Sequence, residues 1–91
     1  MEAFILEYNG EDFVFKNTYD VWSFINQTLP EEITSVTLHR VLHYDGDAEL
    51  DEQIFKSSIV LDVAMLKSLD RWGLLKGLRT ELEKNGQDYG A

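Results

Sequence analysis

The chain has 91 residues, a formal net charge of −9, and 44% hydrophobic residues. This length suits one domain, and the hydrophobic content is too high for a disordered chain. The lack of cysteine excludes disulfides and thiolate chemistry, and no apolar run is long enough for a secretory signal or a membrane span. We therefore expect a cytoplasmic protein that does not associate with membranes.

The charge is unevenly distributed along the chain. Residues 1–55 hold twelve acidic residues against Lys16 and Arg40, a net charge of −10, whereas residues 56–91 carry a net charge of +1. Such an acidic surface repels nucleic acids and anionic membranes and attracts basic proteins. We therefore expect a basic protein partner and no direct binding of nucleic acid.

Residues 3–16 are predicted to form a β-hairpin. Asn9-Gly10 is the preferred dipeptide for a type I′ turn, in which both central residues have positive φ. The register of a two-residue loop places four apolar side chains on one face: Phe4, Leu6, Phe13 and Phe15. The other face carries Ile5 and Val14 beside Glu7 and Asp12, a like-charge pair that costs stability.

An amphipathic helix is predicted over residues 18–29. Asn17 or Thr18 can cap its first turn, and Pro30 ends it. Its apolar residues recur at helical spacing: Val21, Trp22, Ile25 and Leu29.

A second hairpin is predicted to follow this helix. Residues 33–44 are rich in β-branched side chains and favour a strand. A turn at Asp45-Gly46-Asp47 would lead into a second strand over residues 48–56, pairing Leu50 with Leu42 and Ile54 with Leu38. This register also places Arg40 beside Glu52 or Asp51 as its expected partners. One face of the first strand would carry Val36, Leu38, Leu42 and Tyr44.

Residues 59–85 are predicted to be mainly helical, beginning at Ser57 or Ser58. The apolar stripe changes phase at Gly73, where we expect a break between two helices. The expected fold class is α+β: an antiparallel sheet of two β-hairpins (β-β-α-β-β) with C-terminal helices packed on one face. Residues 1–86 would form a single domain and residues 87–91 a flexible tail.

The sequence contains no recognisable catalytic or metal-binding pattern. On a strand, His39 and His43 would lie about 13 Å apart, too far to bind one ion, so we expect them to face solvent or form local hydrogen bonds. The run from Asp45 resembles the start of a calcium loop, but Lys56 stands where the bidentate glutamate is needed. Because no serine–histidine–acid order or phosphate-binding glycine loop is apparent, we expect no enzyme, no cofactor and no metal site.

The acidic run after residue 44 is the main candidate for a binding surface. Acids alternate at positions 45, 47, 49 and 51, and on a strand they would repeat every ~6.8 Å on one face. This ladder would imitate the phosphates of a nucleic-acid strand, or it would protect an edge strand from aggregation. The predicted partner-binding residues are Glu7, Asp12, Asp45, Asp47, Glu49, Asp51 and Glu52.

In size, charge and lack of catalytic residues, the chain resembles the small inhibitors encoded by phages and mobile elements, some of which mimic DNA or block CRISPR effectors. Together with the acidic surface, this resemblance implies inhibition or regulation of a basic, nucleic-acid-binding partner. Two alternatives stay open. One is a homodimeric structural or assembly protein that pairs through an edge strand or the leucine-rich helices, and the other is an immunity-type protein that neutralises a toxin.

Overall fold

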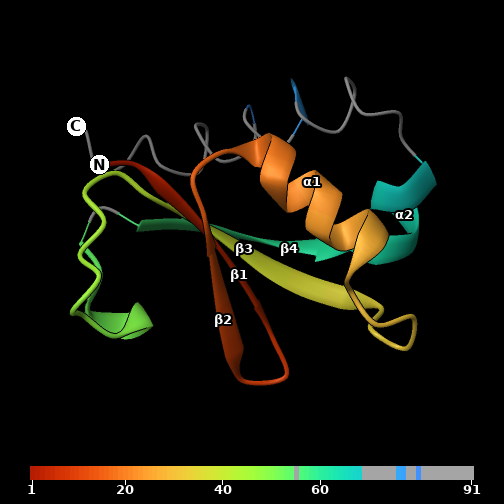
Figure 1. Ribbon diagram of the computed structural model, residues 1–91, viewed down its shortest axis with the longest axis horizontal. Coiled ribbons are helices and arrows are strands. Elements are labelled where there is room, and N and C mark those ends of the chain that lie inside the picture. The colour runs from red at the N-terminus through yellow and green to blue at the C-terminus, as the bar shows by residue number, and fades with distance from the viewer. Residues whose placement is uncertain (55, 69–75, 78–79, 81–91) are drawn as a thin grey trace.

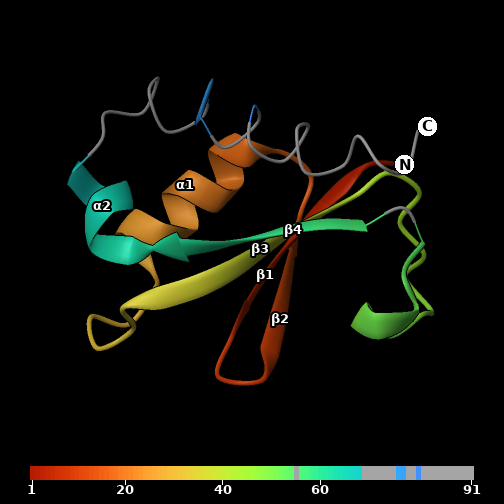
Figure 2. The ribbon, with the colours of Figure 1, turned by 180° about the vertical axis from the view of Figure 1, so that it is seen from behind.

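Four antiparallel strands form one sheet in the order β2-β1-β3-β4. The computed structural model describes residues 1–54, 56–68, 76–77 and 80 of the chain. Figures 1 and 2 show helix α1 (Thr18–Gln27) on one side of this sheet and the short 3₁₀ helix η1 (Leu50–Glu52) on the other. The α+β class predicted from the sequence is therefore confirmed.

The first hairpin is confirmed together with its register. Strand β1 (Ala3–Tyr8) pairs with β2 (Glu11–Phe15), and Phe4 lies opposite Phe15 as predicted. The φ angles of Asn9 and Gly10 are 51° and 76°, the positive values that a type I′ turn requires. On its other side, β1 pairs with β3 (Ser35–Val41), so β1 is an inner strand of the sheet.

Helix α1 begins at Thr18 as predicted, but it ends at Gln27, two residues before the predicted end at Leu29. The side chain of Asn17 accepts a hydrogen bond of 2.9 Å from the backbone N–H of Asp20, which caps the first turn. At the other end, the N–H groups of Thr28 and Leu29 both donate to the carbonyl of Phe24, just before Pro30.

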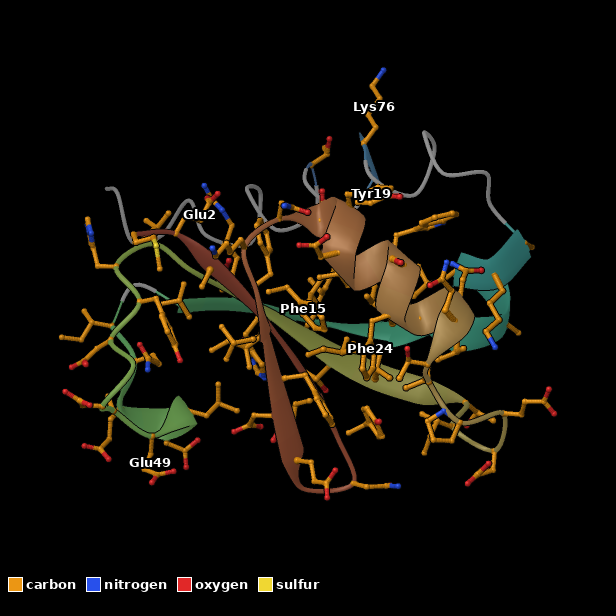
Figure 3. The ribbon with its side chains drawn as sticks, viewed as in Figure 1. Glu2, Phe15, Tyr19, Phe24, Glu49 and Lys76 are labelled. Atoms are coloured by element: carbon orange, nitrogen blue, oxygen red, sulfur yellow. The ribbon has the colours of Figure 1, made fainter. Side chains whose placement is uncertain are left out.

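The hydrophobic core lies between the sheet and the helices. Helix α2 (Val63–Ser68) follows directly from β4, and Asp62 caps it by accepting from the N–H of Met65 at 3.0 Å. Figure 3 shows Phe15 and Phe24 between α1 and the sheet, and their ring centroids are 5.4 Å apart. The buried cluster consists of Phe4, Leu6, Val21, Ile25, Leu29, Val36, Leu38, Val63 and Leu66.

The second hairpin differs from the prediction. The strand that follows β3 and pairs with its other edge is β4 (Lys56–Asp62), and it places Ile59, in place of Ile54, opposite Leu38. Residues 59–62 are therefore strand, although they were expected to start a helix, and residues 48–54 lie outside the sheet. The β-branched pair Ile59-Val60 suits a strand better than the acidic segment before it.

The predicted partner of Arg40 is also wrong. Its guanidinium binds the carboxylate of Glu2, with Nε and Nη2 each 2.7 Å from Oε2, and it does not pair with Glu52 or Asp51. The shift of the pairing strand from residues 48–56 to 56–62 removes Glu52 from the position opposite Arg40, where Ser57 lies. The pair with Glu2 ties the end of β3 to the segment before β1.

Several sequence predictions lie wholly or largely outside the described residues, namely the helix after Ser68, the break at Gly73 and the tail 87–91. Of the predicted helical region after Ser68, the structure describes Lys76, Gly77 and Thr80, which are helical. Within the described part of the chain, no helix is both long and apolar enough to cross a membrane.

The type I′ turn gives a direct test of the fold. Gly10→Val places a β-branched residue at a φ of +76°, with no neighbouring atom within 4 Å of the added Cβ. The cost is therefore conformational, and we expect the free energy of unfolding to fall by about 1–2 kcal/mol in urea denaturation.

Gly46→Ala is the control for this variant. Its added Cβ would lie 3.8 Å from Tyr44, an ordinary contact, and its backbone does not adopt a positive φ. We expect its stability to match the wild type. Equal losses in the two glycine variants would contradict the assignment of the cost to the turn.

Candidate functional site

Residues 42–54 form a loop that covers one end of the sheet face opposite α1. The side chain of Gln53 holds it: Nε2 donates to the carbonyls of Asp45 at 2.7 Å and Ala48 at 3.1 Å, and Oε1 accepts from the N–H of Asp45 at 3.1 Å. Gln53 is only 9% exposed, so these bonds are largely shielded from water. We call this segment the acidic loop.

Backbone hydrogen bonds fix the tip of the acidic loop further. Asp45 accepts from the N–H of Asp47 through its carboxylate at 2.9 Å and from the N–H of Ala48 through its carbonyl at 3.2 Å. The carbonyl of Glu49 accepts from the N–H of Glu52 at 3.0 Å, while the Glu49 side chain makes no capping bond to η1. The carboxylate of Asp45 thus shapes the loop, whereas the carboxylate of Glu49 takes no part in capping.

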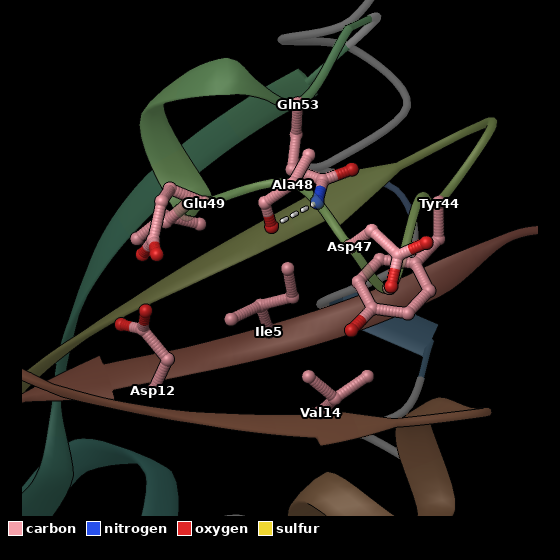
Figure 4. A pocket seen from close by; sticks show the side chains of 10 residues that line it. Ile5, Asp12, Val14, Tyr44, Asp47, Ala48, Glu49 and Gln53 are labelled. Atoms are coloured by element: carbon pink, nitrogen blue, oxygen red, sulfur yellow. Dashed lines mark hydrogen bonds between the residues drawn. The ribbon is translucent and has the colours of Figure 1, made fainter.

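A pocket of about 240 Å³ lies between the acidic loop and the first hairpin. Its floor includes Ile5 and Val14, whose side chains rise from β1 and β2, and Tyr44 lies at one side (Figure 4). Figure 4 also shows the carboxylate of Glu49 directed toward that of Asp12 on β2. The residues that line the pocket are Ile5, Asp12, Val14, Tyr44, Gly46, Asp47, Ala48, Glu49, Leu50 and Gln53.

The structure brings together three of the seven predicted site residues. Asp12, Asp47 and Glu49 line the pocket, although they come from segments more than thirty residues apart. The described lining residues include no lysine or arginine to balance them. We call these three residues the acidic triplet.

The other four predicted residues lie around this pocket in different settings. Glu7 is the cross-strand neighbour of Asp12, and Asp45 is used within the loop as described above. Asp51 and Glu52 are exposed in η1 and do not line the pocket. The pocket also has an apolar floor and an aromatic wall that the prediction from acidic residues did not include.

The prediction of an acidic ladder on a strand is wrong. Residues 45–49 precede η1 without forming a strand, so their carboxylates do not repeat at strand spacing on one face. The same finding removes the interpretation of residues 45–52 as a protected edge strand, because the outer strands of the described sheet are β2 and β4. Acidic residues instead meet across the pocket.

A second polar cluster lies on the same face of the sheet. His39 on β3 is 6% exposed, and its Nδ1 lies 2.6 Å from Ser58 Oγ on β4. Its Nε2 lies 3.0 Å from Glu7 Oε1 on β1. His39 is therefore buried and bonded to residues distant in the chain, although it was expected to face solvent or to form local hydrogen bonds. Its bond to Glu7 offsets the like-charge pairing of Glu7 with Asp12.

The sequence did not reveal this serine–histidine–acid contact. Ser58 was predicted to start a helix, and only the observed register of β4 places it opposite His39. In the described ranges, no group of three or more His, Asp or Glu side chains is arranged to hold a metal ion. Comparisons with protein-family models, curated proteins and solved structures find no match to this chain.

The role of Gln53 in holding the acidic loop can be measured. Gln53→Ala leaves the carbonyls of Asp45 and Ala48 without their side-chain donor. We expect the free energy of unfolding to fall by about 1–3 kcal/mol in urea, and amide hydrogen exchange at Asp45 to accelerate.

Gln27→Ala provides a matched control, because Gln27 is exposed at the end of α1. We expect it to change stability by less than about 0.5 kcal/mol. Unchanged exchange at Asp45 in Gln53→Ala would show that the loop is held by other contacts.

Proposed function

We propose that this protein is a small acidic binding protein whose pocket face engages a positively charged protein and inhibits or regulates it. The meeting of the acidic triplet around one open pocket carries this proposal. Three carboxylates, with no lysine or arginine among the described lining residues, produce a local negative potential. This potential accelerates encounter with a basic protein surface and favours such a surface over neutral or acidic ones. Proteins that bind nucleic acids present such surfaces and are the partner class that we favour.

The pocket suits an arginine or lysine side chain of the partner. Such a side chain has an aliphatic stem and a charged head, which favour different surroundings. The floor formed by Ile5 and Val14 offers apolar contact to the stem, and the acidic triplet offers acceptors to the head. The ring of Tyr44 adds an aromatic face for a cation. An arginine would use these features most fully, because its planar group can bind two acceptors at once.

Because residues 45–51 do not form a strand, one of the two ways in which they were expected to bind a partner becomes less favourable. A basic groove that reads regularly spaced phosphates would find no such spacing along residues 45–51. We therefore favour insertion of basic side chains into the pocket over imitation of a nucleic-acid backbone. An immunity-type protein that neutralises a basic toxin would use the same pocket, and it remains a variant of this proposal.

The acidic triplet can be tested with a short oligo-arginine peptide as the probe. The double variant Asp47→Asn/Glu49→Gln removes two charges from the pocket, and no described capping bond of η1 depends on the Glu49 side chain. We expect the dissociation constant, measured by calorimetry, to rise about 10-fold, since an exposed ion pair contributes up to about 1 kcal/mol. A citrulline peptide of the same length should bind neither protein.

The matched control is Glu31→Gln/Glu32→Gln, which changes the net charge equally in the exposed turn between α1 and β3. We expect this control to bind the oligo-arginine peptide within about 2-fold of wild type, because screened charges at a distance contribute little. Equal weakening in both variants would mean that the peptide responds to net charge alone, and the proposed pocket would be rejected.

The alternative of a homodimeric assembly protein has one favourable observation. Val60 is 73% exposed on β4, an outer strand of the described sheet. Outer strands are sites where a second copy can add to a sheet. Light scattering at increasing concentration tests this alternative: a rise toward twice the monomer mass, abolished by Val60→Lys, would support it, and a constant monomer mass would exclude it.

A further inference from the structure

Two hydrogen bonds join Glu7, His39 and Ser58 across three neighbouring strands. His39 lies directly opposite Ser58 in the pairing of β3 with β4, and Glu7 lies on the adjoining strand β1. The distances are 2.6 Å from His39 Nδ1 to Ser58 Oγ and 3.0 Å from His39 Nε2 to Glu7 Oε1. A hydroxyl bound to a histidine that is itself oriented by a carboxylate is the arrangement that activates serine nucleophiles.

The partners of His39 determine where its proton lies. An ionised carboxylate can only accept, so Nε2 of the neutral imidazole carries the hydrogen and donates it to Glu7. Nδ1 is then the acceptor, and the hydroxyl of Ser58 donates to it. The hydrogen bonds therefore run in the direction that draws the proton of Ser58 toward the imidazole.

The histidine and the serine of this hydrogen-bonded cluster differ in their exposure. His39 is buried, whereas the Ser58 residue is exposed on the face opposite α1. The next residue of β4 on that face is Val60, which is 73% exposed and offers an apolar surface beside the hydroxyl. A reagent can therefore reach Ser58 while its base stays shielded, and both residues lie on strands that hold their separation fixed.

We propose that Ser58 is a nucleophile activated by His39 and that it accepts acyl groups from activated carboxylic esters. The Ser58 oxygen forms a bond to the carbonyl carbon as its proton passes to His39 Nδ1. The bond from that carbon to the leaving oxygen then breaks, and His39 returns the proton to the leaving group. Ser58 remains as an ester, and Glu7 acts as a positioning residue that keeps the imidazole in the required tautomer.

This inference does not rest on the proposed partner. The cluster is separate from the pocket, since Glu7, His39 and Ser58 are not among its lining residues. Acylation of Ser58 is a covalent modification that requires one reaction and no turnover. Failure of the oligo-arginine test would therefore not contradict the proposed reactivity of Ser58.

The test is acetylation of the full chain by p-nitrophenyl acetate, followed by peptide mass spectrometry. We expect one acetyl group on Ser58 and none at this position in Ser58→Ala. Ser35→Ala is the matched control, because Ser35 is also exposed on a strand but lies opposite Asp62 and not opposite a histidine. Acetylation of Ser35 as fast as Ser58 would overturn the proposal.

Two further variants separate activation from stability. His39→Gln removes the base, and we expect acetylation of Ser58 to slow about 100-fold, the lower range for base catalysis. In Glu7→Gln, the side-chain amide N–H can donate a hydrogen bond to Nε2, which moves the imidazole hydrogen to Nδ1. Nδ1 can then no longer accept the proton of Ser58, so we expect acetylation to slow to a similar extent.

Thermal unfolding of the same variants gives the second readout. Glu7→Gln keeps a side chain of the same size and hydrogen-bonding reach, so we expect its fold and circular dichroism to be retained while the acetylation rate falls. If His39→Gln does not fold, Glu7→Gln alone decides the matter. Wild-type rates of Ser58 acetylation in a folded Glu7→Gln or His39→Gln variant would overturn the proposal.

Discussion

The pairing of β1 with β2 on one side and with β3 on the other divides the molecule into two faces. Alternation along β1 sends Phe4 and Leu6 into the core and directs Ile5 and Glu7 to the opposite side. The Asn9-Gly10 turn fixes this alternation, because a slip of one residue would exchange the two sets. Both the core beneath α1 and the polar features of the other face depend on this register.

The two faces are covered by different means. Apolar side chains of α1 and α2 cover one, so its stability comes from burial of hydrocarbon. The other is covered at one end by a polar loop that is held through the amide of Gln53. The loop also places the carboxylates of residues 47 and 49 around the same pocket as Asp12, and their mutual repulsion raises the electrostatic free energy of the isolated protein. A cationic partner would relieve that repulsion.

The hairpin and α1 were predictable because independent local signals agreed. In the hairpin, the turn dipeptide agrees with the alternation of apolar residues along the two strands. In α1, the Asn17 cap agrees with the helical spacing of Val21 and Ile25. The second half of the sheet was not predictable. Leu50 and Ile54 imitate strand alternation, and the run Ile59-Val60-Leu61 is too short for its periodicity to distinguish strand from helix. The contacts that Gln53 makes with the acidic loop, and that Ser58 makes with His39, depend on the tertiary structure. No local sequence pattern therefore predicts them.

The way the acidic loop is held also bears on how this protein can evolve. Gln53 binds backbone groups of Asp45 and Ala48, and the bond at Asp47 uses its backbone N–H, which any residue except proline can supply. The side chains at positions 47 and 49 are thereby released from a folding role. Mutations there would change the charge of the pocket while the scaffold persists, without a need for compensatory mutations in the core.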